Sequence, residues 1–123
     1  MLFQRFRSFS IYAMGTFYIM AGLMHFANSG WFVSIVPPIF PYKLEIVYIT
    51  GIAEIILGFL LLFPKKRYYA GIGLIVLLIL VYPANIYLAI TNGMVIGLDP
   101  VIAWGRLPLQ FVFIGIAYWH ANI

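Results

Sequence analysis

Long apolar stretches separated by short polar segments dominate this chain. Four of them are long enough to cross a bilayer, since a spanning helix needs about 20 mostly apolar residues. They cover approximately residues 9–27, 44–63, 68–90 and 106–121. Inside a bilayer every backbone amide must find a partner within its own segment, which favours helices. The pattern therefore predicts an all-α fold, an integral membrane four-helix bundle that forms a single domain over residues 1–123.

The segment between the first two stretches, residues 28–43, differs from an ordinary loop. It is rich in apolar and aromatic side chains, but Pro37, Pro38 and Pro41 prevent a helix throughout. We expect this apolar segment to lie as a lid over the outer mouth of the bundle. The link between the second and third stretches, which begins at Pro64, is by contrast only a tight turn.

The basic residues predict an orientation for the bundle. Five of the seven Lys and Arg residues lie at the start of the chain or in the tight turn. They are Arg5, Arg7, Lys65, Lys66 and Arg67. Lys43 and Arg106 fall on the opposite side. Because cytoplasmic segments of membrane proteins carry the excess of Lys and Arg, we expect both termini to be cytoplasmic.

The composition supports a membrane protein and excludes several classes of function. Hydrophobic residues make up 65% of the chain and charged residues only 8%, against about 25% charged in soluble domains. The chain has no cysteine, which excludes disulfides, thiolate metal sites and thiol redox chemistry. The formal net charge of +4 lies at the ends of the apolar stretches. We therefore expect the lipid bilayer, and not nucleic acid, as a partner.

A few polar side chains interrupt the apolar stretches, and at least one lies in each stretch. The ligand-pocket candidates are His25, Glu54, Asn85, Arg106 and Gln110. All are expected at or above the membrane midplane on the outer side, while the inner halves supply almost none. Ionisable groups at this depth are costly to bury and commonly mark a function. The pattern predicts a polar cavity that opens outward, with Glu54 at its floor and the 28–43 segment as its roof.

Small residues share a helix face with two of these polar groups. Gly51 and Gly58 lie about one helical turn on either side of Glu54. His25 lies on one stripe with Gly22. We expect both faces to turn inward, because small residues allow membrane helices to pack closely.

Pro83 lies inside the third stretch, close to Asn85. A proline has no backbone N–H, so it cannot bond the carbonyl of Ile79 one turn earlier. We therefore expect a kink beside Asn85 and a free backbone acceptor at Ile79.

A structural explanation competes with the pocket for each polar residue. His25, Asn85 and Gln110 also suit simple hydrogen bonds between helices, each of which contributes about 0.6 kcal/mol on average. Arg106 also suits an anchor at the membrane interface. A carboxylate near the midplane, at Glu54, is harder to explain in this way.

The titratable residues indicate neither a metal site nor a haem. His25 and His120 are the only histidines, and they are expected at opposite membrane faces, which rules out a bis-His haem in one subunit. His120 is expected to lie at the membrane end. No spacing of His, Asp and Glu defines a coordination sphere, so we expect no metal, and the residues alone identify no cofactor.

Four short motifs, in order along the chain, resemble the DoxX family of small bacterial membrane proteins. They are AGLMHF at 21–26, GIAE at 51–54, YPAN at 82–85 and RLPLQ at 106–110. The resemblance implies a four-helix protein of the bacterial cytoplasmic (inner) membrane. It also implies a distant relationship to the DoxD subunit of thiosulfate:quinone oxidoreductase, and through it a quinone-linked role.

We expect a small membrane subunit or accessory protein whose outward-facing polar pocket binds a lipophilic ligand, with quinone as the ligand that the resemblance suggests. The isolated chain is not expected to be an enzyme; at most it is one subunit of a membrane oxidoreductase. The alternative is a non-catalytic assembly or scaffold protein that docks partner helices. Either role involves a homo-oligomer or a larger membrane protein complex. A transporter for a small solute ranks third, because four spans are few for alternating access.

Overall fold

The computed structural model describes residues 2–91, 93–94 and 97–121, and these form helices joined by turns and short irregular segments. The helices are α1 (Leu2–Ala27), α2 (Ser29–Ile35), α3 (Lys43–Leu61), α4 (Arg67–Ile90) and α5 (Pro100–Ala121). The four long helices, α1, α3, α4 and α5, are each long and apolar enough to cross a membrane. This confirms an all-helical fold with four candidate spans.

The first and last long helices begin earlier than hydropathy indicates. Helix α1 starts at Leu2 instead of near residue 9, so the basic start of the chain is helical. Helix α5 starts at Pro100 instead of near residue 106. There the backbone N–H of Val101 donates to Oδ1 of Asp99 at 2.8 Å. Asp before Pro is a strong start signal, because the side chain accepts from a free N–H and proline suits the first helical position.

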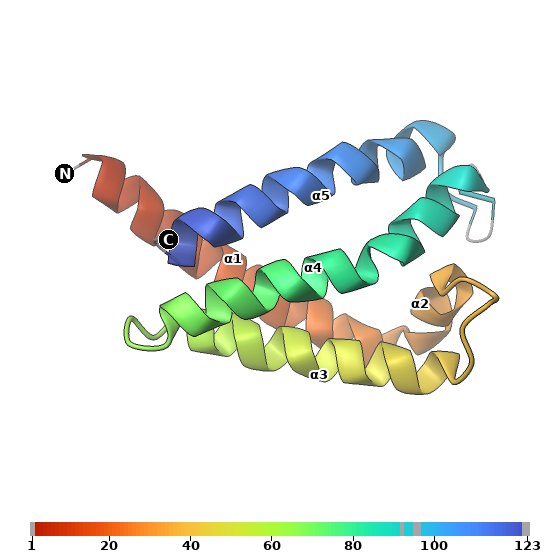
Figure 1. Ribbon diagram of the computed structural model, residues 1–123, viewed down its shortest axis with the longest axis horizontal. Helices are drawn as coiled ribbons and strands as arrows, with labels where there is room; N and C mark the ends of the chain where they lie inside the picture. Colours follow the sequence, from red (N-terminus) through yellow and green to blue (C-terminus); the bar gives the residue numbers. More distant parts are fainter. Residues whose placement is uncertain (1, 92, 95–96, 122–123) are drawn as a thin grey trace.

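The predicted lid segment is partly helical. Its first half forms α2, which ends at Ile35. The next residue, Val36, has an extended backbone, as expected for a residue that precedes proline. The Pro-rich remainder then returns the chain to α3 (Figure 1).

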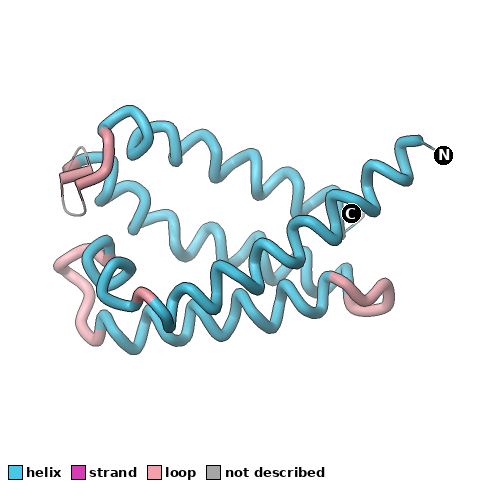
Figure 2. Tube along the Cα trace, turned by 180° about the vertical axis from the view of Figure 1, so that it is seen from behind, coloured by secondary structure: helices cyan, strands magenta, loops and turns pink. Residues whose placement is uncertain are grey.

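The long helices associate as two pairs, α1 with α3 and α4 with α5, and α3 joins the pairs by packing against α4. Both termini and the turn at 62–66 lie at one end of the molecule, here called the termini end. Helix α2 and the 36–42 segment lie at the other, the α2 end. Figures 1 and 2 show α1 and α5 meeting near the termini end and diverging toward the α2 end.

Glycines allow α1 and α3 to touch along their backbones. A methyl group added at Gly58 would lie 2.8 Å from the carbonyl oxygen of Gly15. One added at Gly22 would lie 2.5 Å from the carbonyl oxygen of Gly51. The expectation that these small faces turn inward is confirmed, and the reason is steric: no larger residue fits at this separation.

Pro83 lies within α4, which continues unbroken to Ile90. Close to this proline, the side-chain amide of Gln110 donates to the backbone carbonyl of Leu78. The sequence predicted a free backbone carbonyl at Ile79. In the structure the side chain of Gln110 donates to the carbonyl of the residue before it, Leu78. A polar residue of α5 thus bonds the α4 backbone in the turn that precedes the proline.

Two apolar clusters fill the interior. The larger lies toward the termini end and consists of Ile11, Tyr18, Leu61, Ala70, Leu74 and Ala117. The smaller lies under α2 and consists of Ile35, Leu88 and Ala103. Helix α2 is therefore packed onto the α4–α5 pair through Ile35.

The outer surfaces of the four long helices are strongly apolar. In their most apolar windows only 28%, 22%, 28% and 17% of the residues are buried, in chain order. Large side chains such as Phe9, Ile49, Leu80 and Phe111 are more than half exposed. Soluble monomers rarely expose contiguous apolar surface on this scale, so these faces require an apolar environment.

Candidate functional site

His25 and Glu54 meet between α1 and α3, and we call them the His25–Glu54 pair. Imidazole Nδ1 lies 2.7 Å from the backbone carbonyl oxygen of Ala21 and 3.6 Å from Oε2 of Glu54. The Nδ1 proton therefore bonds Ala21, because 3.6 Å is too long for a hydrogen bond to the carboxylate. With Nδ1 as the donor, the neutral ring carries its acceptor lone pair on Nε2.

The carboxyl group of Glu54 is enclosed but incompletely satisfied. Its side chain is only 14% exposed. Within the described part of the chain, buried Oε2 has no hydrogen-bond partner, and the same holds for the hydroxyl of Tyr18. A buried polar oxygen without a partner costs about 1–3 kcal/mol. The site therefore has unused capacity to bond a donor or acceptor from outside the protein.

Helix α2 covers this pair directly. The ring of Phe32 stacks on the imidazole of His25, with centroids 3.9 Å apart and an angle of 18° between the planes. Helix α2 has only seven residues, and it packs against α1, α3 and α4. The predicted lid thus lies over one of the predicted pocket residues.

Asn85, Arg106 and Gln110 form a second cluster between α4 and α5, which we call the Arg106 relay. Arg106 Nε donates to Oδ1 of Asn85 at 3.1 Å. Asn85 Nδ2 donates to Oε1 of Gln110. Gln110 Nε2 in turn donates to the Leu78 carbonyl. The relay fixes the guanidinium against the α4 backbone through two buried amides.

The five predicted residues thus fall into two clusters, one in each helix pair. Among the residues that the structure describes, no hydrogen bond or ion pair joins the two clusters. Helix α2 links them by packing: Phe32 stacks on His25, while Ile35 packs on Leu88 and Ala103. Those two residues lie about one helical turn from Asn85 and Arg106. Both clusters therefore adjoin the α2 end.

A polar cluster at the termini end was missed by the sequence analysis. The imidazole Nε2 of His120 lies 2.7 Å from the hydroxyl of Ser10. His120 is 1% exposed. Its backbone carbonyl accepts from Nη2 of Arg7 at 2.8 Å. His120 lies in the last turn of α5, at the helix end where the sequence predicted it. The sequence did not predict that its ring is enclosed and paired with Ser10 across the α1–α5 contact.

Arg67 also has a structural role at the termini end. Its guanidinium donates to the carbonyls of Leu61 at 2.9 Å and Leu62 at 3.4 Å. Arg7 acts similarly on the last turn of α5, through Trp119 and His120. Both cations therefore neutralise the negative ends of helices, where a positive charge is favourable. No local signal in the sequence distinguishes these residues from ordinary topology-determining arginines.

No group of three or more His, Cys, Asp or Glu residues within the described ranges is arranged to hold a metal ion. A surface hollow of about 540 Å³ lies at the termini end. It is lined by Leu60, Phe63, Pro64, Lys65 and Lys66. None of these lining residues belongs to either cluster, so the hollow is separate from the candidate site.

Comparisons with known proteins identify the family of the chain. No curated protein and no solved structure matches it. The sequence profile of a family described as "Domain of unknown function (DUF8561)" matches residues 14–121, a range that includes both clusters. The match covers most of the 123 residues, and the chain therefore belongs to the DUF8561 family.

Proposed function

We propose that the chain is a multi-pass protein of a bacterial inner membrane, with four spans and both termini in the cytoplasm. The apolar outer surfaces and the helix lengths support insertion, since even α3, with 19 residues, extends about 28 Å. The termini end carries most of the basic residues, which supports its cytoplasmic location. On this orientation the α2 end faces outward.

We further propose that the protein is a small membrane subunit or accessory protein that binds a lipophilic ligand at the α2 end. The observation that carries this proposal is the unbonded, buried Oε2 of Glu54 beside His25. The carboxyl group of Glu54 and Nε2 of His25 exchange hydrogen bonds with ligand oxygens. Displacement of α2 admits the ligand, and Phe32 closes over it.

The motifs that resemble the DoxX family support a quinone as this ligand. Reduction of a quinone takes two electrons and two protons. Glu54 and His25 supply groups that can pass protons to or from its oxygens. We propose that a partner protein supplies the electrons, so that the chain serves as one subunit of a membrane oxidoreductase.

Native mass spectrometry of protein purified in mild detergent tests the lipophilic ligand. We expect wild type to retain a small mass that matches a quinone or another lipophilic molecule. Glu54→Gln and His25→Ala should each lose most of it. Glu45→Gln is the matched control, because Glu45 starts the same helix but is exposed. Equal retention in all four proteins would contradict the proposal.

The alternative, a scaffold that docks partner helices, is favoured by one observation. Helix α5 is the least covered candidate span, with 17% of its apolar window buried. A methyl group added at Gly105 or Gly115 would meet no atom within 4 Å. Because Gly15, Gly51 and Gly58 are instead used inside the bundle, they are unsuitable for testing this role. Loss of co-purifying membrane proteins in Gly115→Leu, with folding intact, would support the scaffold.

A further inference from the structure

Arg106 differs from the other partly buried arginines in how its charge is compensated. Arg7 and Arg67 each donate to backbone carbonyls at the C-terminal ends of helices, where the helix dipole offsets a positive charge. Arg106 donates instead to the neutral side chain of Asn85. The close contact of a basic side chain with a carboxylate found within the described residues joins His25 to Glu54, and no carboxylate there pairs with Arg106.

The hydrogen bonds of the Arg106 relay fix the orientation of this guanidinium, whose charge no carboxylate among the described residues offsets. Gln110 is held by the Leu78 carbonyl, and Asn85 is held by Gln110. The Asn85 oxygen takes the Nε proton of Arg106. The bonds of the relay use one guanidinium N–H and leave the two terminal NH₂ groups, the part of arginine that forms parallel bonds to an oxyanion. Two buried amides thus hold the guanidinium in one orientation.

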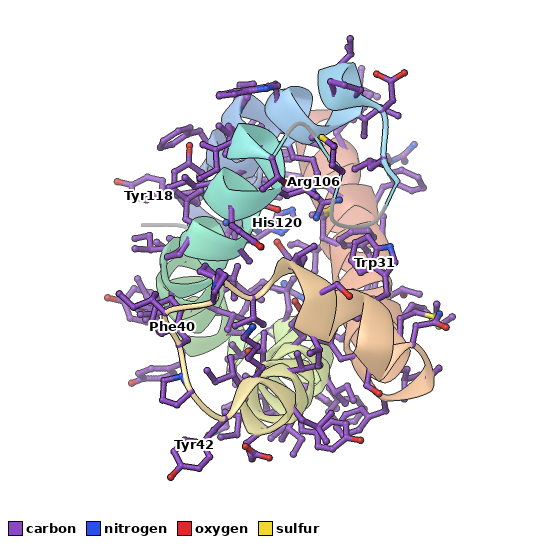
Figure 3. All side chains as sticks on the ribbon, turned by 90° about the vertical axis from the view of Figure 1, so that its right-hand side faces the viewer. Trp31, Phe40, Tyr42, Arg106, Tyr118 and His120 are labelled. Carbon is purple, nitrogen blue, oxygen red and sulfur yellow. The ribbon has the colours of Figure 1, made fainter. Side chains whose placement is uncertain are left out.

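The position of Arg106 suits a bound ligand better than contact with bulk solvent. Its side chain is only partly exposed. Figure 3 looks onto the α2 end and shows Arg106 within the outline of the helices, whereas Tyr42 and Tyr118 project from the periphery. A cation withdrawn from water in this way is costly unless an anion or a strong acceptor accompanies it.

We propose that Arg106 binds the oxyanion of an anionic amphiphile, a phosphate or carboxylate headgroup, at the α2 end. This inference goes beyond the proposed function, because it assigns to Arg106 a second ligand, distinct from the quinone proposed at the His25–Glu54 pair. The headgroup accepts paired hydrogen bonds from the two terminal nitrogens of Arg106. The acyl chains lie along the apolar surface of the bundle. Asn85 and Gln110 are positioning residues, which act on the ligand only through the guanidinium.

Binding to delipidated protein in a neutral detergent tests the inference by native mass spectrometry. The probes are phosphatidylglycerol and diacylglycerol with identical chains, oleate, and inorganic phosphate. We expect phosphatidylglycerol to bind wild type at least about tenfold tighter than diacylglycerol, which lacks the phosphate, the effect of one charge-assisted bond pair. Arg106→Gln should reduce this preference to near parity. Lys43→Gln, which removes the other basic side chain at this end, should retain it.

The remaining probes identify the source of the oxyanion. Binding of phosphatidylglycerol or oleate at concentrations where inorganic phosphate does not compete supports an amphiphile. Binding of inorganic phosphate at the same concentrations would overturn the proposal that the ligand is an amphiphile. An equal loss in Arg106→Gln and Lys43→Gln would also overturn the proposal, because it would indicate bulk attraction of anions to a basic surface.

Asn85 provides a second variant that leaves the arginine in place. Asn85→Ala keeps the charge but removes the acceptor that orients it, so we expect the preference to fall several-fold. Asn85→Asp places a carboxylate on Nε and should abolish it. Unchanged preference in both folded variants would contradict the relay. Glu45→Gln, at an exposed position outside both clusters, should leave the preference intact. Loss of the lipophilic mass in Glu54→Gln tests the His25–Glu54 pair separately, so failure at Arg106 is distinguishable from failure of the proposed pocket.

Discussion

Buried carboxyl groups in proteins are normally bonded, which makes Glu54 exceptional among the described carboxyl groups. One of its oxygens lies in the interior without a donor, and its nearest ionisable neighbour, His25, directs its Nδ1 proton to a backbone carbonyl. Unsatisfied groups of this kind lower stability and are retained where function requires them. The missing hydrogen bond at Oε2 of Glu54 is therefore the residue-scale feature that most strongly supports a ligand site.

Glu54→Met should stabilise the protein. Methionine has a similar length and removes a buried oxygen that lacks a partner, so we expect the free energy of unfolding to rise by about 1 kcal/mol. The measurement is thermal or denaturant unfolding in detergent. Glu45→Met, at an exposed position of the same helix, should change stability by less than about 0.5 kcal/mol. A large loss of stability in Glu54→Met would show that Glu54 is a structural partner.

At the scale of the elements, the molecule combines close and loose packing. Helices α1 and α3 are in backbone contact at Gly15, Gly22, Gly51 and Gly58. Helix α2 contacts the bundle through side chains that include Phe32 and Ile35. Because Phe32 stacks on His25, displacement of α2 would uncover the candidate site.

Gly58→Ala should destabilise the α1–α3 pair. The added methyl group would lie 2.8 Å from the Gly15 carbonyl oxygen, so the helices must separate, at a cost of about 1–3 kcal/mol. Gly115→Ala is the matched control, because the same methyl group meets no atom within 4 Å there. The midpoint temperature of thermal unfolding in detergent measures the stability of both variants. Equal effects would contradict the backbone contact.

Phe32→Ala should expose His25 without unfolding the bundle. Removal of the stacked ring opens one face of the imidazole, so its modification by diethyl pyrocarbonate should accelerate several-fold. His120 serves as the internal reference, since it is enclosed at the other end and bonded to Ser10. Mass spectrometry of peptides reports both sites. Acceleration at both histidines would indicate general loosening and would contradict a lid role for α2.

At the scale of the whole molecule, the two helix pairs meet differently at the two ends. The tight turn at 62–66 and the contacts of Arg7 and Ser10 with the end of α5 close the termini end. At the α2 end, α1 and α5 diverge and α2 spans the two pairs (Figures 1 and 2). This asymmetry places the larger apolar cluster toward the termini end and the candidate site toward the α2 end.

Labelling of single cysteines tests the proposed orientation, and the cysteine-free chain suits this experiment. Ser34 and Lys65 are exposed at the α2 end and the termini end, respectively. In intact spheroplasts, a membrane-impermeant maleimide should label Ser34→Cys. Lys65→Cys should be labelled only after the membrane is permeabilised. The reverse pattern would place the termini outside and contradict the proposed topology.

The sequence by itself determined the number and approximate position of the long helices, because apolar runs, prolines and backbone hydrogen bonding act locally. It also identified the inward faces that carry Gly51 and Gly58, since small residues at helical spacing leave few alternatives. It placed the first residues of α1 and α5 poorly, because both helices begin with residues that are less apolar than the stretches used to predict them. The Asp99–Pro100 start of α5 was present in the sequence as a capping signal.

Only the tertiary structure decided which polar residues meet. Asn85 reaches Gln110 across 25 positions of sequence, and Ser10 reaches His120 across 110. Such contacts depend on the rotation and crossing of helices, which apolar periodicity constrains weakly when the outer surface is apolar as well. The same packing separated the five predicted residues into two clusters, because His25 and Glu54 meet within the α1–α3 pair and the other three meet within the α4–α5 pair. It also left Oε2 of Glu54 without a hydrogen-bond partner among the described residues.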